Sequence, residues 1–242
     1  MTRDVQASSS TKPWDTRELP QGTEKVAAVR NMFDTIAPRY DMVNRIMTFR
    51  LDVRWRRQAV AALGLPAGAL VLDLASGTGD LCIDLSEAGL IPLSADLSFG
   101  MLAQDRSGAP RLQADILVLP VPDASVDGVT CGFALRNLVD LDRFFDELAR
   151  VVRPGGRISL LDVGRPTNPI IRIGNAIYFG RIVPLIGGLL SDRAAYRYLP
   201  KSVAYLPEPA RLVESLQRAG FVEVEHRNLS GGLTQLLSAT RS

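Results

Sequence analysis

The sequence predicts a doubly wound α/β fold, in which helices cover both faces of a mostly parallel, seven-stranded sheet. Short apolar runs alternate with amphipathic helical stretches between residues 70 and 163. The first of these runs ends at a glycine-rich turn. Two further apolar runs, near the end of the chain, join through Gly231-Gly232 as a hairpin. Regular alternation of strands and helices is typical of a parallel sheet, because each parallel strand needs a crossover helix to return. The hairpin predicts an antiparallel pair at the end of the chain.

Seven segments carry the strand pattern, and helices are expected between them. The strands are Leu70–Ala75, Leu90–Ala95, Arg111–Ala114, Val126–Cys131, Arg157–Val163, Phe221–Asn228 and Leu233–Thr240. The helices are Leu81–Ala88, Ser98–Arg106, Val139–Val152 and Glu208–Ala219. Pro154-Gly155-Gly156 is expected to stop the third of these helices before the fifth strand begins.

Helical segments also precede the first strand. They are Thr23–Ala37, Arg39–Phe49 and Asp52–Leu63. Residues 1–22 are polar and lack the apolar core of a signal peptide, so they are expected to form a disordered leader. Residues 23–242 are then expected to form a single domain.

Composition limits the partners and the compartment. The 242 residues carry 28 basic and 26 acidic side chains with no basic run, which argues against a nucleic-acid partner. Cys82 and Cys131 lack CxxC spacing and fit small core residues in a reducing compartment. His226 is the single histidine. We therefore expect a cytoplasmic protein without a metal site.

The segment Ile170–Leu190 is the most apolar stretch, but Arg172, Arg181 and Pro184 interrupt it, so it falls short of a membrane span. It follows the fifth strand, where such folds place a substrate lid, and the lid is expected over about residues 168–200. We therefore also expect peripheral contact with the inner face of a membrane. The apolar residues expected to line a route for a hydrophobic tail are Ile170, Ile173, Ile177, Phe179, Ile182, Val183, Leu185 and Ile186. The alternative is a helix packed on the core.

A glycine-rich turn closes the first strand. The run VLDLASGTGD over residues 71–80 places Gly77, Thr78 and Gly79 at the entry of a helix. Glycine lets the backbone approach a ligand closely, and free N–H groups at a helix start favour a negatively charged group. A nucleotide-dependent oxidoreductase would need a third glycine where Leu81 and Cys82 stand.

Acidic residues follow the second and third strands. Asp96 is placed to accept hydrogen bonds from both hydroxyls of a ribose; the alternative is an N-cap, for which Ser98 is the better candidate. Asp115 is placed to accept from an adenine amino group with Ile116 against the ring, although an ordinary turn aspartate would look the same. Together with the glycine-rich turn, they favour an adenosine ligand.

Several motifs resemble known families. VLDLASGTGD (71–80), SADLS (94–98), QADILVLPVPD (113–123) and RVVRPGG (150–156) are similar to class I methyltransferases. More narrowly, YDMVN (40–44), Trp55-Arg56, GFALRN (132–137) and YRYL (196–199) resemble the ubiquinone/menaquinone biosynthesis C-methyltransferases. The resemblance covers residues 24–240.

The resemblance implies a cofactor, a reaction and a set of contacts. The cofactor is S-adenosyl-L-methionine, and its methyl group goes to a ring carbon of a prenylated quinol, with demethylmenaquinol giving menaquinol as the leading case. Family cofactor contacts fall on Thr78, Asp96, Asp115 and Ile116, and a family serine aligns with Gly132, which keeps only its backbone. A homodimer is compatible with this assignment.

This chain departs from the family at several positions. The family usually has histidine where Asp52 stands, glutamate where Asp162 stands, and glycine where Ala134 stands. A histidine common in the last strand aligns with Leu237. These changes are expected to cluster on the acceptor side, so two alternatives stay open. One is a C- or O-methyltransferase of a phenolic or polyketide molecule, and the other is a methyltransferase-like protein without catalysis.

Arg136 is the candidate catalytic residue. Methyl transfer to a quinol carbon needs alignment of the two reactants and stabilisation of the oxygen that loses its proton. Arg136 follows the fourth strand at the sheet edge and is expected to hold that oxygen. The alternative is an ion pair with Asp140 and Asp142 at the next helix start. Tyr40 and Asn137 are expected to frame the pocket.

We expect methyl transfer to proceed without a metal ion, because one histidine and two separated cysteines cannot assemble a common ligand set. Rates measured before and after treatment with a chelator should agree. Loss of activity in the chelator, with recovery on adding a divalent ion, would contradict this expectation.

Overall fold

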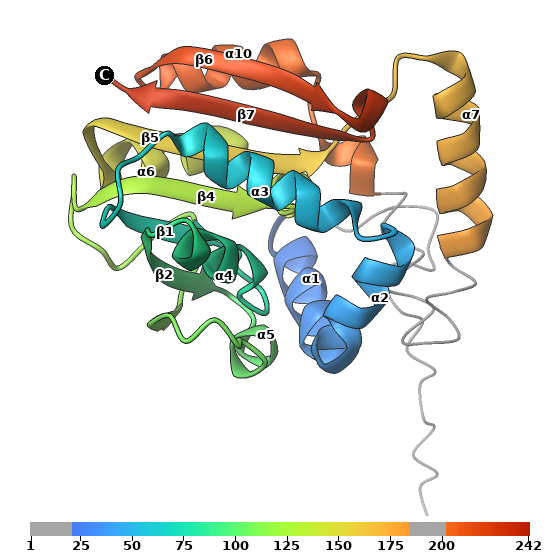
Figure 1. Ribbon diagram of the computed structural model, residues 1–242, viewed down its shortest axis with the longest axis horizontal. Helices are drawn as coiled ribbons and strands as arrows, with labels where there is room; N and C mark the ends of the chain where they lie inside the picture. Colours follow the sequence, from blue (N-terminus) through green and yellow to red (C-terminus); the bar gives the residue numbers. More distant parts are fainter. Residues whose placement is uncertain (1–20, 184–201) are drawn as a thin grey trace, which may run out of the picture.

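The computed structural model describes residues 21–183 and 202–242. In this part of the chain, the strands form one seven-stranded sheet in the order β3-β2-β1-β4-β5-β7-β6 (Figure 1). The first five strands pair in parallel, and β7 runs antiparallel to both β5 and β6. The predicted mostly parallel sheet with a terminal antiparallel pair is therefore confirmed.

The strands agree with the prediction except at the start of the fifth. They are β1 (Leu70–Leu74), β2 (Ile91–Asp96), β3 (Arg111–Gln113), β4 (Val126–Gly132), β5 (Val152–Val163), β6 (Phe221–Leu229) and β7 (Thr234–Arg241). The prediction that β5 begins at Arg157 was wrong. Val152 already pairs with Val126, and the register then shifts so that Arg157 pairs with Gly128. The Pro-Gly-Gly run thus bulges within a strand and does not separate a helix from it.

The helices begin with the segments before the sheet. They are α1 (Gly22–Ile36), α2 (Tyr40–Met47), α3 (Leu51–Leu63), α4 (Asp80–Glu87), α5 (Phe99–Ala103), α6 (Leu141–Val151), α7 (Pro169–Ile177) and α10 (Pro209–Arg218). The prediction that the fifth of these reaches Arg106 was wrong. It ends at Ala103, because the Asp105 carboxylate accepts hydrogen bonds from Ser94 Oγ and Ser107 N and turns the chain back. None of the described helices is long and apolar enough to cross a membrane.

Two helical layers enclose the sheet. The predicted apolar face of α6 is confirmed, since Phe144, Phe145 and Leu148 are fully buried in a core that includes Leu72 and Leu74 of β1. On the opposite face, α3 and α4 pack on side chains such as Val71. At the carboxyl ends of the central strands, α1 and α2 close the end of the sheet (Figure 1).

One buried carboxyl group lies in the centre of this sheet. Asp73 of β1 is fully buried and accepts hydrogen bonds from Thr130 Oγ1 at 2.7 Å and Cys82 Sγ at 3.5 Å. Burial raises the pKa of Asp73 to about 7. The folded protein therefore binds this proton more tightly than the unfolded chain does.

A raised carboxyl pKa stabilises the folded state at low pH, and this stabilisation is lost as the pH rises from about 4 to about 7. Asp73→Asn removes the titrating group, so the variant does not lose this stabilisation. The free energy of unfolding of the variant minus that of the native chain should therefore rise by about 4 kcal/mol across this window. Urea unfolding at several pH values between 4.5 and 8 measures the difference. A difference that does not change with pH would contradict the raised pKa.

Candidate functional site

Two adjoining pockets open at the carboxyl ends of β1, β2 and β4. The smaller pocket is lined by Gly77, Asp96, Asp115, Ile116 and Gly132, which are five of the predicted cofactor residues. The larger pocket has a volume of about 480 Å³, and it contains the predicted Thr78 and Arg136. The two pockets share the glycine-rich turn and the end of β4, so the fold brings the predicted residues to one place.

Gly77 and Gly79 of the turn are required for different structural reasons. Both adopt left-handed backbone conformations, with φ of 59° at Gly77 and 82° at Gly79. A Cβ at Gly79 would lie 2.3 Å from Asp105 Oδ1, whereas a Cβ at Gly77 would meet no atom within 4 Å. Gly79 therefore serves close packing and lines neither pocket, while Gly77 borders open space.

Asp96 stands at the end of β2 with both carboxylate oxygens held by the backbone. Oδ2 accepts from Gly77 N at 2.9 Å and Oδ1 from Ser98 N at 2.7 Å. The N-cap of α5 is Ser98, whose hydroxyl accepts from Met101 N. A carboxylate accepts about four hydrogen bonds, so Asp96 keeps capacity for a ligand. Burial, partly offset by these N–H donors, raises the pKa of Asp96.

The residues after β3 combine a turn with a pocket wall. Asp115 is exposed and its Oδ1 accepts from Leu117 N at 2.9 Å, as the turn interpretation requires. It nevertheless lines the smaller pocket beside Ile116, which is buried. An aromatic ring lying against Ile116 would have the Asp115 carboxylate within the same pocket.

Helix α2 is attached to the glycine-rich turn by charged and polar contacts. Thr78 Oγ1 donates to Asp41 at 2.5 Å, and Asp41 also pairs with Arg106. Arg45 pairs with Asp80 at 3.0 Å. These contacts hold α2 over the turn and leave Thr78 almost fully buried.

Helix α1 is fastened by two polar residues that the sequence interpretation missed. Lys25 Nζ donates to the carbonyls of Arg136 at 3.1 Å and Leu138 at 3.0 Å, and lies 3.6 Å from the centre of the Tyr205 ring. Burial lowers the pKa of Lys25 to about 8. Asp34 accepts from Ser98 Oγ and Gly100 N, at 2.5 and 2.9 Å.

The helical spacing of the sequence contained a signal that Lys25 is buried. The buried stripe of α1 consists of Lys25, Ala28, Met32 and Ile36. The apolar residues Val26, Val29 and Phe33 face the smaller pocket instead. A lysine in line with a buried stripe indicates a cation that is satisfied by backbone carbonyls of another segment.

Arg136 lies inside the larger pocket and is 5% exposed. Its guanidinium pairs with the carboxylate of Asp162, which also accepts from Arg136 N at 3.0 Å. The alternative ion pair with Asp140 and Asp142 is wrong. The 3₁₀ turn at Leu135–Asn137 directs Arg136 inward, while Asp140 caps α6 and Asp142 pairs with Arg218.

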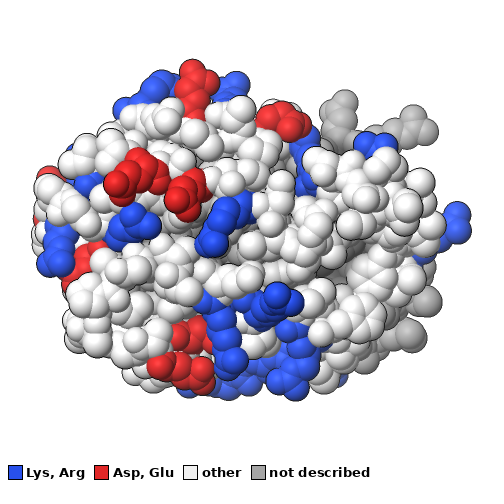
Figure 2. Space-filling view, turned by 45° about the horizontal axis from the view of Figure 1, so that its top comes forward, with Lys and Arg blue, Asp and Glu red and all other residues white. Residues whose placement is uncertain are grey.

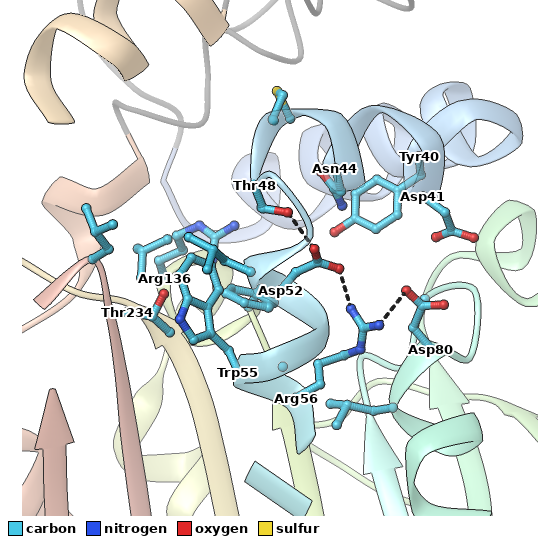
Figure 3. Close-up of a pocket in the computed structure, with 18 of the residues that line it drawn as sticks. Tyr40, Asp41, Asn44, Thr48, Asp52, Trp55, Arg56, Asp80, Arg136 and Thr234 are labelled. Atoms are coloured by element: carbon cyan, nitrogen blue, oxygen red, sulfur yellow. Dashed lines mark hydrogen bonds and ion pairs between the residues drawn. The ribbon is translucent and has the colours of Figure 1, made fainter. Parts of the chain in front are cut away.

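A hydrogen-bonded chain of charged groups crosses the larger pocket (Figure 3). Thr48 Oγ1 donates to Asp52 Oδ1 at 2.5 Å, and Arg56 binds Asp52 Oδ2 at 2.6 Å. Arg56 continues to Asp80 at 3.2 Å and Asp84 at 2.9 Å. Asp52, where the family usually has histidine, is thus linked to the glycine-rich turn.

Two departures from the family lie in or against the larger pocket. Asp52 lines it, and Asp162 holds Arg136, which also lines it. Leu237 was expected on the acceptor side with the other departures. This was wrong, because Leu237 is fully buried in the core of the sheet. Ala134 lines the smaller pocket and not the larger one, so it does not lie with the other two departures.

Helix α7 stands beside the larger pocket, but with a different face than expected. The residues that line the pocket are Ile171, Gly174, Asn175 and Tyr178. The expected Ile170, Ile173 and Ile177 are 81%, 61% and 51% exposed. The helical stripe that faces the pocket is therefore shifted by one residue from the predicted one.

The remaining lid residues have mixed outcomes. Ile182 is exposed and Val183 packs with residues of α1 and α2. Leu185 and Ile186, the motif at 196–199 and most of the expected leader lie outside the described residues, as does the side chain of Phe179.

The fold and the paired pockets define a class I S-adenosylmethionine-dependent methyltransferase. Solved structures of this kind are similar to the chain. Magnesium protoporphyrin IX methyltransferase from Synechocystis with bound SAH has a TM-score of 0.59 and 21% identity, over 90% of this chain and 100% of that one. A SAM-dependent methyltransferase from Thermotoga maritima has a TM-score of 0.63 and 18% identity, over 88% and 99%.

The chain belongs to the ubiE/COQ5 methyltransferase family, whose model matches residues 21–241. It is 41% identical to the demethylmenaquinone methyltransferase of Thermus thermophilus, over 85% of this chain and 97% of the relative. It is 38% identical to the ubiquinone/menaquinone biosynthesis C-methyltransferase UbiE of Syntrophotalea carbinolica, over 88% and 94%. The chain is an enzyme that uses S-adenosylmethionine.

Replacing Asp96 with alanine should weaken binding of the cofactor by about 1.5–3 kcal/mol, because hydrogen bonds to a charged acceptor are lost. Calorimetric titration with the demethylated product, S-adenosylhomocysteine, measures this affinity. Asp123→Ala is the matched control, since that carboxylate pairs with Arg150 away from both pockets. An unchanged affinity in Asp96→Ala would exclude a ribose contact.

Proposed function

We propose that the chain transfers a methyl group from S-adenosylmethionine to a ring carbon of a prenylated quinol, with demethylmenaquinol converted to menaquinol. The observation that carries this proposal is the larger pocket, whose apolar wall surrounds the buried Arg136 directly beside the smaller pocket. The names of the curated relatives support the same acceptor.

The smaller pocket fits the nucleoside part of the cofactor. Asp96 would accept the ribose hydroxyls, Asp115 the adenine amino group, and Ile116 would lie against the ring. Gly77 and Gly132 would contribute backbone contacts, and the space at Gly77 allows such an approach. When bound, the cofactor supplies a methyl group already activated on a sulfonium. The enzyme then has to align the acceptor and exclude water.

Arg136 is suited to bind an oxygen of the acceptor. A guanidinium has five N–H donors and no acceptor, so it donates to that oxygen and takes up no proton. Asp162 fixes its position from one side and leaves other donors of the fork for the acceptor. Tyr40 lies in the same pocket, and burial raises the pKa of its hydroxyl, which therefore stays a donor.

We also propose that the rim of the larger pocket contacts a membrane. Ile170, Ile173 and Ile177 of α7 are exposed. Phe49 is 75% exposed, and its ring lies 5.9 Å from that of Tyr178, the residue that follows α7. Figure 2 shows a broad, hollowed surface with few charges on the right, where α2 and α7 lie. A prenyl tail resides in lipid, so an apolar rim gives it a route into the pocket.

A second candidate acceptor is a phenolic or polyketide molecule without a prenyl tail. Asp52 favours it, since a carboxylate replaces the histidine usual in quinol methyltransferases of this family at a position inside the larger pocket. Offering both kinds of acceptor with labelled cofactor, and detecting which becomes methylated, separates the two candidates.

Replacing Ile173 and Ile177 with aspartate should raise KM for a long-tailed quinol in anionic vesicles by about tenfold or more, because each exposed isoleucine loses apolar contact with lipid. A tail-less ring analogue in solution should keep its KM. Val222→Asp, at an exposed position of β6, is the control for an added surface charge.

Equal losses with both acceptors, in variants with native circular dichroism, would place these isoleucines in a structural role. A native enzyme that prefers the tail-less ring would contradict the prenylated acceptor.

A further inference from the structure

The polar groups of the larger pocket gather at two ends. Figure 3 shows Thr48 and Asp52 on one side of Trp55, and Thr234 together with Arg136 on the other. The middle is aromatic, because Trp55 packs 6.3 Å from the ring of Phe133, which also lines the pocket. A flat ring with one oxygen at each end would match this distribution.

At the first end, Thr48 and Asp52 form a pair able to accept a proton. Asp52 is 4% exposed, and its two oxygens are held separately by Thr48 Oγ1 and by Arg56. Because Thr48 donates its own hydrogen to Asp52, the lone pairs of its oxygen are available to a bound hydroxyl. A proton can then pass from that hydroxyl to Thr48 while Thr48 passes its own to Asp52.

The other ionisable groups of the larger pocket are less suited to this role. Asp41 pairs with Arg106 and Asp80 with Arg45 and Arg56, and both carboxylates lie at the glycine-rich turn beside Thr78. Asp73 is enclosed by Thr130 and Cys82 within the sheet. Arg136 has no acceptor atom.

At the second end, Thr234 carries a buried hydroxyl that lacks a hydrogen-bond partner among the described residues. Thr234 is the first residue of β7, is 1% exposed and lines the larger pocket. Among the described residues, its Oγ1 is the buried side-chain nitrogen or oxygen without a hydrogen-bond partner. Buried polar groups are normally paired, so such an atom at a pocket wall points to a bound ligand as its partner.

We propose that the acceptor is an aromatic ring bearing two oxygens and lies across the larger pocket, with one hydroxyl against the Thr48–Asp52 pair, which accepts its proton, and the other oxygen bound by the Thr234 hydroxyl. The inference rests on the proposed function and assigns residues to the acceptor that the family resemblance did not.

The ring hydroxyl loses its proton through Thr48 to Asp52, and the freed electron pair is delocalised onto the ring carbon. That carbon forms a bond to the methyl group as the carbon–sulfur bond breaks, and the sulfur keeps the electron pair of that bond. The ring carbon then releases its hydrogen to water as a proton, and Asp52 returns its proton through Thr48 to the ring oxygen.

The Thr48–Asp52 pair is tested by the pH dependence of kcat under anaerobic, reducing conditions with a short-tailed naphthoquinol. Asp52→Asn should lower kcat about 100-fold, as expected for loss of a general base. Asp52→His should recover activity with the acidic limb of the profile moved to higher pH, since an imidazole titrates above a carboxylate. Thr48→Val should lower kcat and Thr48→Ser should not.

Asp142→Asn is the control for the Thr48–Asp52 pair. Asp142 pairs with Arg218 at 3.3 Å and lines neither the larger nor the smaller pocket. Its replacement should leave the pH profile unchanged, and all variants should bind S-adenosylhomocysteine with the native affinity. Native kcat in Asp52→Asn and in Thr48→Val, or an unmoved acidic limb in Asp52→His, would overturn the assignment.

Thr234 is tested by pairing a variant with an altered ring. Thr234→Val should raise Ki for a dihydroxynaphthalene inhibitor roughly fivefold, the loss expected from one hydrogen bond, and should not change Ki for the analogue with a single hydroxyl. The same variant should unfold at a higher temperature without ligand, since the unpaired hydroxyl is removed. Thr234→Ser should behave as the native chain.

Equal Ki changes for the two rings, or none for either, would overturn the role of Thr234. Failure of the proposed function has a different signature, in which the native enzyme methylates no quinol at any pH. The roles given to Thr48, Asp52 and Thr234 are contradicted only when the native enzyme methylates the quinol and the variants behave as the native enzyme does.

Discussion

The position of β1 inside the sheet, between β2 and β4, is the constraint on which the rest of the structure depends. Its neighbours β2 and β4 continue the chain in opposite directions across the sheet, so the connections after β1 and β4 diverge. In open α/β sheets, this divergence leaves a crevice at the carboxyl ends of the strands. The glycine-rich turn, Asp96 and the loop after β4 all border that crevice, and each follows directly from its strand.

The helices before the sheet close the crevice by polar contacts as well as by apolar packing. Lys25, Asp34 and Asp41 each bind a different strand-end loop, through backbone carbonyls, the start of α5 and Thr78 respectively. Burying a lysine is unfavourable, and its lowered pKa reflects this. The contacts nevertheless fix the covering helices at defined points, while Val26 and Phe33 supply the apolar wall between them.

Arg56 connects the two halves of the site. Its guanidinium binds Asp52 on α3 and Asp80 and Asp84 on α4, which begins at the glycine-rich turn. A planar fork with five donors can hold three carboxylates in fixed directions, which an ammonium does less well. The acceptor side and the cofactor side are therefore positioned by one buried cation. A shift of α2 or α3 would therefore displace residues of both pockets.

The sequence by itself determined the order of strands and helices, the glycine-rich turn and the acidic strand ends. Strand periodicity, glycine at a tight turn and acidic residues after strands are local patterns, and local chemistry fixes them. Residues of the smaller pocket such as Asp96 and Ile116 could be placed beside the glycine-rich turn for this reason, since they lie within a few positions of a strand end.

Only the tertiary structure decided the partners of the charged groups and the face that each helix turns to the pocket. Arg136 pairs with Asp162, 26 residues away, and not with the nearer Asp140. Thr234 and Thr48 reach the same pocket from opposite ends of the chain. The exposed Ile173 and the pocket-lining Gly174 differ by one helical position. These outcomes depend on which elements meet in space, and a rotation of 100° per residue along a helix is enough to reverse them.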